Sequence, residues 1–96
     1  MVNIQKRLKR FTMGKHHIYI AECSDGTYYT GYAVNVKSRI KVHNSGKGAK
    51  YTRARRPVTL KYTESFDTKS EALKREYAIK QLTRVQKEEL MSEVKR

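Results

Sequence analysis

Two short segments rich in β-branched and aromatic residues, separated by one tight turn, restrict most strongly how this chain can fold. Residues 17–23 are apolar on both alternating faces, a pattern typical of a central strand. Residues 27–32 have the composition of a second strand. Between them lies Ser24-Asp25-Gly26, whose residue types favour a turn. The two segments therefore predict a β-hairpin.

After the hairpin the pattern becomes helical. Asn35 is a candidate N-cap for a helix over about residues 36–44, and Gly46 and Gly48 follow as helix-ending residues. Residues 45–57 contain small and basic residues up to Pro57, and we expect them to form a loop.

A third strand and two helices complete the predicted domain. Residues 58–66 have a strand pattern. Capping-box patterns begin at Thr68 and Thr83, and they predict helices over about 69–82 and from 83 to about 94. The predicted order is β-β-α-β-α-α, a small α/β domain with one sheet and helices packed on it.

The length and the apolar content exclude several classes of protein. With 96 residues the chain forms one domain, which we place at residues 15–96 after a basic tail at 1–14. No apolar run approaches the ~18 residues of a membrane span, and the basic start leads into no signal-peptide core. Cys23 is the single cysteine, which fits a reducing compartment. We therefore expect a cytoplasmic protein without a membrane partner.

The distribution of charge indicates the class of partner. The formal net charge is +13, and residues 26–63 contain nine basic residues and no acidic one. Such a segment repels itself unless a polyanion neutralises it, and nucleic acid is the commonest such partner. A basic surface that only keeps the protein soluble is the alternative.

Three charged or titratable side chains lie on or beside the predicted apolar helix faces. On a helical wheel Glu76 falls in the middle of the face marked by Ala72, Leu73 and Ile79. A carboxylate there is unfavourable unless it is paired or binds a metal, and an i,i+4 pair with Lys80 is equally compatible with the wheel.

The first helix carries the other two. Arg39 lies at the border of its inner side, where a guanidinium could hold a phosphate or belong to a solvated basic face. His43 falls close to Val36 on the inner side, and a half-buried, hydrogen-bonded histidine is the simpler interpretation.

The order of these residues resembles a known family. His17-Ile18-Tyr19 and, ten residues after Tyr19, Tyr29-Thr30-Gly31 are similar to the paired signature of the GIY-YIG nuclease superfamily. The other matching segments are Ala33–Arg39 with His43-Asn44 (its arginine helix), Glu71–Glu76 with Ile79-Lys80 (its metal-carboxylate helix), and Gly46–Arg53 with Arg56-Pro57 (a loop of its small, stand-alone bacterial branch). The resemblance covers residues 16–90, and it departs from the signature at His17, at Thr30 and at Tyr32, where some relatives carry a lysine.

The resemblance implies a central three-stranded sheet flanked by helices and a divalent-metal-dependent DNA endonuclease, acting in DNA repair or recombination. It implies that Glu76 holds Mg²⁺ or Mn²⁺, that Arg39 binds the reacting phosphate, and that Tyr19 is the general base or relays a proton to His43. Tyr29 would orient the attacking water or Tyr19. No organic cofactor is expected. The residues expected to grip DNA phosphates are Lys47, Lys50, Arg53, Arg55 and Arg56.

The hairpin register decides whether the two signature tyrosines can cooperate. A two-residue Asp25-Gly26 turn, which the local sequence favours, places Tyr19 and Tyr29 on opposite faces. A three-residue loop with Gly26 left-handed pairs Tyr19 with Gly31 and places both tyrosines on one face. We predict the second register because a shared catalytic face requires it.

Two other classes of function remain open. A nucleic-acid-binding module without catalysis needs only the basic segment, whereas an interaction module that recruits a nuclease would use the polar last helix. The binding module gains nothing from Glu76 on an inner face, and the interaction module would not cut DNA alone.

Overall fold

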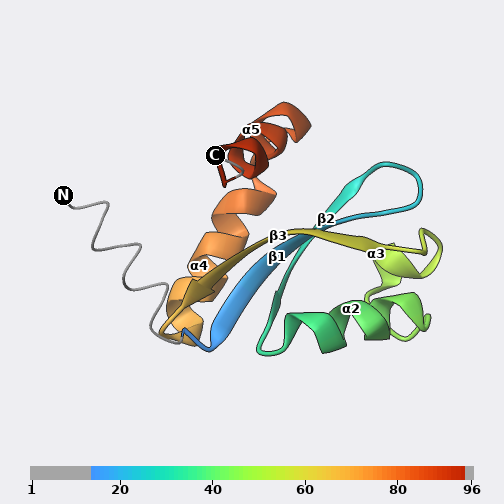
Figure 1. Cartoon of the computed structure of the whole chain (residues 1–96), viewed down its shortest axis with the longest axis horizontal. Coiled ribbons are helices and arrows are strands. Elements are labelled where there is room, and N and C mark those ends of the chain that lie inside the picture. Colours follow the sequence, from blue (N-terminus) through green and yellow to red (C-terminus); the bar gives the residue numbers. More distant parts are fainter. Residues whose placement is uncertain (1–13, 95–96) are drawn as a thin grey trace.

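The computed structural model describes residues 14–94, so the predicted tail, apart from Gly14, lies outside the described residues. Figure 1 shows one sheet between two groups of helices. The predicted α/β fold with a three-stranded sheet flanked by helices is confirmed. The elements are β1 (His16–Glu22), β2 (Tyr28–Ala33), α2 (Val36–Asn44), α3 (Lys50–Arg53), β3 (Thr59–Phe66), α4 (Lys69–Lys80) and α5 (Arg84–Val94).

The hairpin has the predicted three-residue loop. Tyr19 pairs with Gly31 and Ala21 pairs with Tyr29, so the predicted register is confirmed. The backbone N–H of Cys23 donates to the Thr27 carbonyl at 2.8 Å, and Gly26 has φ +85°. The two-residue turn that Asp-Gly favours is absent because Gly26 is used as the left-handed residue of a bulge.

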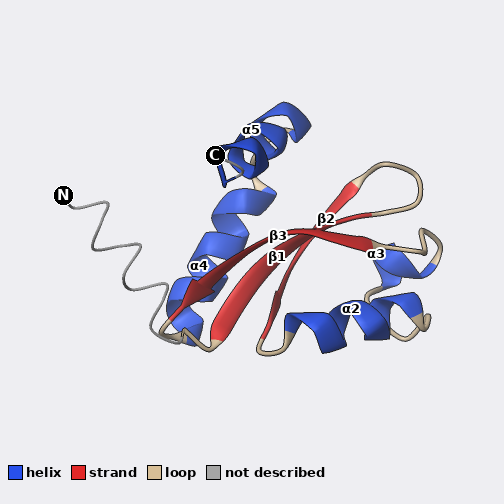
Figure 2. Cartoon of the chain, viewed as in Figure 1, coloured by secondary structure: helices blue, strands red, loops and turns tan. Residues whose placement is uncertain are grey.

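β1 is the central strand, and both of its faces are covered. The strand order is β2-β1-β3 and all pairs are antiparallel. Ile18 and Ile20 lie in one core cluster with Ala72 and Ile79 of α4. Tyr19 and Ala21 face the other way, toward a second cluster packed by Val36 and Ile40 of α2. Figure 2 shows α2 and α3 on one side of the sheet and α4 and α5 on the other, which leaves β2 as an edge strand reached from both sides.

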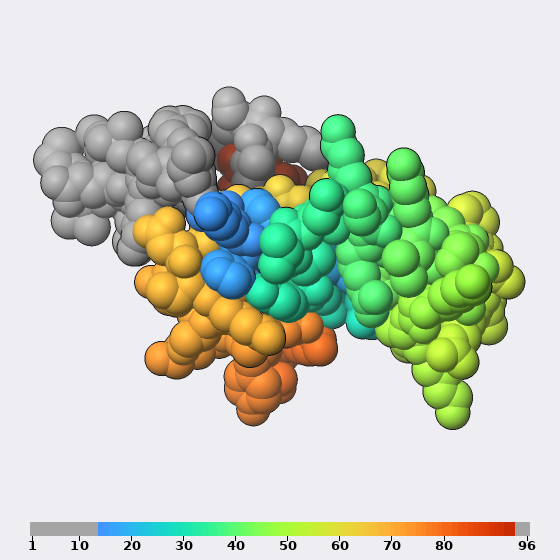
Figure 3. All heavy atoms as spheres, turned by 90° about the horizontal axis from the view of Figure 1, so that it is seen from below, coloured from blue at the N-terminus to red at the C-terminus, as the bar shows by residue number. Residues whose placement is uncertain are grey.

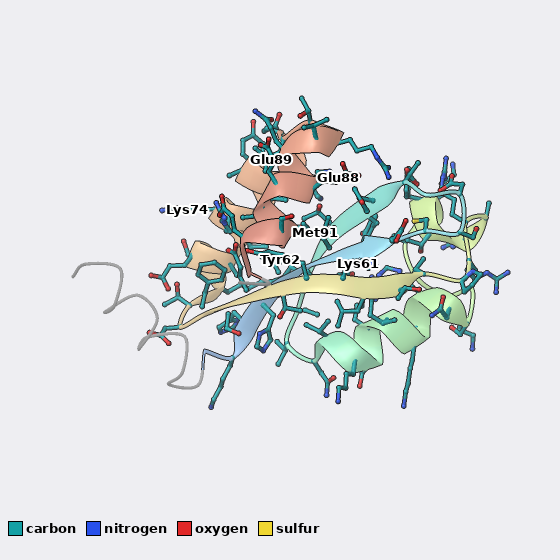
Figure 4. The ribbon with its side chains drawn as sticks, turned by 45° about the horizontal axis from the view of Figure 1, so that its top comes forward. Lys61, Tyr62, Lys74, Glu88, Glu89 and Met91 are labelled. Carbon is teal, nitrogen blue, oxygen red and sulfur yellow. The ribbon has the colours of Figure 1, made fainter. Side chains whose placement is uncertain are left out.

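The helices α4 and α5 are fixed to the sheet by apolar and ionic contacts. Met91 of α5 and Tyr62 of β3 share the first core cluster and lie between helix and sheet (Figure 4). The Arg75 guanidinium donates to both oxygens of Glu64 at 2.8 and 2.9 Å. This bidentate pair holds α4 in one rotation about its axis.

The predicted helix starts are confirmed. The Asn35 side chain accepts from the N–H of Ser38 at 3.0 Å. Both predicted capping boxes form: Thr68 and Glu71 bond reciprocally at the start of α4, and Thr83 and Gln86 do the same at the start of α5. Each box satisfies backbone donors that the first turn of a helix leaves unpaired.

Some details of the prediction were wrong. Residues 45–57 are not a continuous loop, because they contain α3 (Lys50–Arg53). Each strand begins or ends one residue away from its predicted position, and α4 ends at Lys80 instead of residue 82. Leu73 is 41% exposed, so it does not belong to the inner face of α4. Within the described residues, no helix combines the length and apolar character needed to cross a membrane.

Candidate active site

Tyr19 reaches the candidate site from the centre of the sheet. Its side chain is only 1% exposed, and its partner across the hairpin is Gly31. A Cβ added to Gly31 would lie 2.5 Å from the Tyr19 hydroxyl oxygen and 2.6 Å from Cζ. The end of the Tyr19 ring, with its hydroxyl, therefore lies over Gly31 of β2, an edge strand. A side chain at position 31 would occupy this space.

His43 on α2 binds this hydroxyl directly. Its Nε2 lies 2.7 Å from the Tyr19 oxygen, and its side chain is fully buried. Burial lowers the pKa of His43, and the charge of Arg39 lowers it further. Burial, followed by the neighbouring Tyr29, raises the pKa of Tyr19 to about 12, against a hydrogen bond and the charge of Arg39. At neutral pH the site therefore pairs a protonated phenol with a neutral imidazole, an acceptor for the phenol's proton.

Aromatic rings extend from this pair toward the surface. The Tyr29 ring lies 6.3 Å from that of Tyr19 and meets the His43 ring edge-on at 5.2 Å. Tyr51 of α3 stacks beside Tyr29 at 6.0 Å, and the Arg55 guanidinium covers Tyr51 at 3.9 Å. The rings hold the two signature tyrosines on one face, as the register predicted.

Glu76 lies on α4, which packs on the other side of the sheet. Its side chain is 17% exposed and its Oε2 lies 3.2 Å from Lys80 Nζ, so the i,i+4 pair left open by the sequence is formed. Its negative charge nevertheless reaches Tyr19 and contributes to the raised pKa of that phenol. The outline in Figure 3 is hollowed between α4 in orange and the segment around α3 in yellow-green, with β2 between them. The structure is therefore compatible with both interpretations of Glu76, as a metal ligand and as the ion-pair partner of Lys80.

The donor set at this edge suits only some metal ions. The described residues contain no group of three or more His, Cys, Asp and Glu side chains that could hold a metal. A zinc site needs such a group. One carboxylate is enough for Mg²⁺, which retains most of its water ligands and takes substrate oxygens as well. Glu76 fits this second kind of site, since it supplies one carboxylate that is 17% exposed and lies 3.2 Å from Lys80 Nζ through Oε2.

Of the five predicted phosphate-binding residues, the three arginines are bonded within the protein and the two lysines have no ion-pair partner among the described residues. Arg53 and Arg56 donate to the carbonyls of Gly48 and Arg53, at 3.2 and 2.9 Å. Arg55 pairs with Asp25 of the hairpin turn, outside the segment 26–63, at 3.1 Å. The remaining two, Lys47 and Lys50, are exposed, and the described residues give them no ion-pair partner.

The sequence did not reveal three residues of this site. Thr52 is fully buried and its Oγ1 lies 2.9 Å from His43 Nδ1. Gly48 leaves room for His43, because an added Cβ would lie 2.4 Å from Nδ1. Tyr51 stacks on Tyr29. All three lie in the segment expected to be a loop, where no periodicity distinguishes an inward side chain.

The five residues that the resemblance nominated for catalysis all act on Tyr19 or include it. Tyr19, Tyr29 and His43 are in ring contact, and the charges of Arg39 and Glu76 both shift the pKa of Tyr19. Asn44, which accompanied them in the sequence, is instead structural, since its amide bonds the backbone of Val58 at 2.7 and 3.0 Å.

Comparisons with known proteins show the family of the chain. A family model described as the GIY-YIG catalytic domain matches residues 15–89. A UPF0213 protein of Halobacterium salinarum is 68% identical over 75 residues, covering 78% of this chain and 97% of that protein. A UPF0213 protein of Staphylococcus saprophyticus is 62% identical over 81 residues, covering 84% of this chain and 99% of that protein.

Solved structures give the same result. The solution NMR structure of the protein EF2693 from E. faecalis is 47% identical with a TM-score of 0.57, covering 82% of this chain and 84% of that one. The UPF0213 protein BH0048 from Bacillus halodurans, also solved by NMR, is 55% identical with a TM-score of 0.53, covering 80% and 82%. The chain therefore belongs to the GIY-YIG catalytic domain family, a family of nucleases, and is similar to its small stand-alone UPF0213 members.

Proposed function

We propose that this protein is a divalent-metal-dependent endonuclease that hydrolyses phosphodiester bonds in DNA, in repair or recombination. The observation that carries the proposal is the buried hydrogen bond between Tyr19 and His43, 2.7 Å long, beside Arg39. A phenol with a raised pKa and a neutral imidazole form a proton relay, which phosphodiester hydrolysis needs in order to activate water.

The relay transfers two protons, one from water to Tyr19 and one from Tyr19 to His43. As the attacking water gives a proton to the Tyr19 oxygen, Tyr19 gives its own proton to Nε2 of His43. The water oxygen then forms a bond to phosphorus, and the bond from phosphorus to the leaving oxygen breaks. The leaving oxygen departs as an oxyanion and takes a proton from solvent water, and His43 later returns its extra proton to solvent. This route avoids a free phenolate, which a pKa of about 12 makes unfavourable at neutral pH. Tyr29, in contact with both rings, orients the water and Tyr19.

Arg39 and Glu76 supply the opposite charges that the reaction needs. The Arg39 guanidinium, already beside the Tyr19 hydroxyl, binds the phosphate oxygens on which negative charge develops. Glu76 would hold Mg²⁺ or Mn²⁺, and such an ion, when bound, places positive charge at the leaving oxygen. The Glu76 side chain is largely shielded from solvent, and its Oε2 pairs with Lys80.

The test is a cleavage assay with the purified full chain. Linear, branched and single-stranded DNA of defined length are incubated with Mg²⁺, with Mn²⁺ or with EDTA, and RNA of the same sequence is included. We expect cutting with either ion and none with EDTA. Binding without cutting under every condition would instead support the nucleic-acid-binding module, and cutting only after a second protein is added would support the interaction module.

We predict that Lys47 and Lys50 supply much of the affinity for DNA. The Lys47→Ala, Lys50→Ala double variant should bind all sequences more weakly and flatten the salt dependence by about two units, one for each phosphate that a lysine no longer neutralises. Both residues are exposed, so the melting temperature should not change.

A control of equal charge is available outside α3 and the loops beside it. Lys61 of β3 and Lys74 of α4 are labelled in Figure 4, and Lys61 pairs with Glu22 at 3.6 Å. The Lys61→Ala, Lys74→Ala variant loses the same net charge. If both double variants lowered DNA affinity equally, the net positive charge of the protein, and not this segment, would account for DNA binding.

A further inference from the structure

His43 is bonded at both ring nitrogens inside the protein. Its Nε2 lies 2.7 Å from the Tyr19 hydroxyl oxygen, and its Nδ1 lies 2.9 Å from the Thr52 hydroxyl oxygen. A neutral imidazole carries one proton, so one of these nitrogens donates and the other accepts. The partners determine which nitrogen holds the proton.

The bonds at Thr52 favour one direction. Thr52 Oγ1 also lies 2.9 Å from the carbonyl oxygen of Ala49, which can only accept. A hydroxyl has one proton, and when Thr52 gives that proton to Ala49 its oxygen is left as an acceptor. The matching donor is then N–H at Nδ1 of His43.

The bonds at Tyr19 favour the same direction. The phenol proton needs an acceptor, and in the described part of the chain His43 Nε2 is the one acceptor that Tyr19 contacts. The positive charge of Arg39 acts on the same phenol and lowers its pKa, so Arg39 does not compete for that proton. The opposite tautomer would place the donor Nε2–H on Tyr19 and leave the phenol proton without a partner among the described residues.

All three bonds therefore run one way: Tyr19 to His43, His43 to Thr52, and Thr52 to the Ala49 carbonyl. We propose that Thr52 is a positioning residue that holds His43 in the Nδ1–H tautomer, with Nε2 free to accept the proton of Tyr19. The part that Thr52 plays in catalysis depends on the proposed nuclease function, whereas the tautomer does not.

The local structure is built for this contact. Thr52 lies on α3, the four-residue helix within the basic segment, and it is fully buried. Gly48 makes the approach possible, since any larger residue would place Cβ against Nδ1. When His43 takes up a second proton it donates from both nitrogens, and Thr52 can keep accepting without moving. The segment thus orients a site residue as well as carrying positive charge.

Two substitutions separate orientation from packing. Thr52→Val has nearly the same shape but no acceptor, and Thr52→Ser retains the hydroxyl. Long-range ¹H–¹⁵N NMR of the ring reports the tautomer directly. In the wild type and Thr52→Ser we expect a protonated Nδ1 and an unprotonated Nε2, and in Thr52→Val a mixture or the reverse.

The cleavage rates should follow the tautomer. Thr52→Val should lower kcat by ~10–100-fold with little change in KM, the usual cost of losing a group that orients a histidine through its far nitrogen. Thr52→Ser should stay within a few-fold of the wild type. Thr30→Val is the matched control, because Thr30 is also buried but its hydroxyl has no hydrogen-bond partner within the described residues. It should retain both the tautomer and the rate.

Two results would overturn the proposal: a wild-type ring protonated at Nε2, or a Thr52→Val variant with unchanged NMR signals and rate. If Thr52→Val does not fold, Thr52→Ala tests the same loss without added bulk. If the wild type cut no DNA but the tautomer changed as expected, the nuclease function would fail and the assignment of Thr52 would stand.

Discussion

Replacing Glu76 by glutamine is expected to abolish metal-dependent cleavage while leaving a folded protein that still binds DNA. The change removes the one carboxylate charge that reaches Tyr19 from α4 and keeps the shape of the side chain. Loss of a divalent ion's charge stabilisation, worth several kcal/mol, should lower the rate by ~10³-fold or more. The measurements are single-turnover cleavage with Mg²⁺ or Mn²⁺, DNA affinity in EDTA, and thermal unfolding.

The variant Lys80→Met distinguishes the site from the ion pair. It removes the partner of Glu76 and leaves the carboxylate in place. Because Lys80 is half exposed, loss of the pair should cost less than ~1 kcal/mol of unfolding free energy in either variant. We expect cleavage within a few-fold of the wild type in Lys80→Met. Equal loss of stability and equal loss of activity in both variants would instead assign Glu76 a structural role.

The sequence predicted the sheet well because the relevant information is local. The apolar character of residues 17–23 on both faces identified the central strand, and Gly26 made the bulged turn possible. The turn itself was ambiguous, since Asp25-Gly26 favours the shorter loop. What decides it is the packing of Tyr19 over Gly31, a contact between strands that no local preference contains.

The segment between α2 and β3 was predicted less well for a different physical reason. α3 has only four residues, so no apolar period can develop, and its buried residue is a threonine. Thr52 is held by a hydrogen bond to His43 instead of by hydrophobic burial. Hydropathy cannot reveal such a residue, because its inward direction depends on a polar partner in another helix.

Glu76 illustrates the limit of the helical wheel. The wheel placed it on an inner face and left metal binding and the Lys80 pair open. The structure contains the pair and also brings the carboxylate near Tyr19, so the two interpretations are not exclusive. Leu73, one position used to define that face, is exposed, because the face is narrower than the wheel suggested.

Gly31→Ala is expected to abolish the proposed cleavage by displacing Tyr19. Gly26 and Gly46 are the two glycines with positive φ among the described residues, so alanine fits the backbone at position 31. In a strand this change would ordinarily be neutral or stabilising. Here the new methyl group would lie 2.5 Å from the Tyr19 hydroxyl oxygen, so the end of that ring must move.

We expect Gly31→Ala to reduce the cleavage rate more than the unfolding free energy. Tyr19 is buried and hydrogen-bonded to His43, so its displacement breaks the proton relay, and cleavage should fall by ~10²-fold or more. Overpacking of this kind should lower the unfolding free energy by ~1–3 kcal/mol. DNA affinity should be unchanged, because Lys47 and Lys50 are remote from the substitution in sequence and exposed.

A double-mutant cycle tests the cause of this loss. In a Tyr19→Ala background the ring is gone, so adding Gly31→Ala should change the unfolding free energy by only a few tenths of a kcal/mol. The coupling between the two positions then measures the clash of the methyl group with the ring. Wild-type cleavage in the single variant Gly31→Ala, or the same destabilisation in both backgrounds, would contradict the placement of Tyr19 over Gly31, and the relay at the edge of β2 would lose its proton donor to His43.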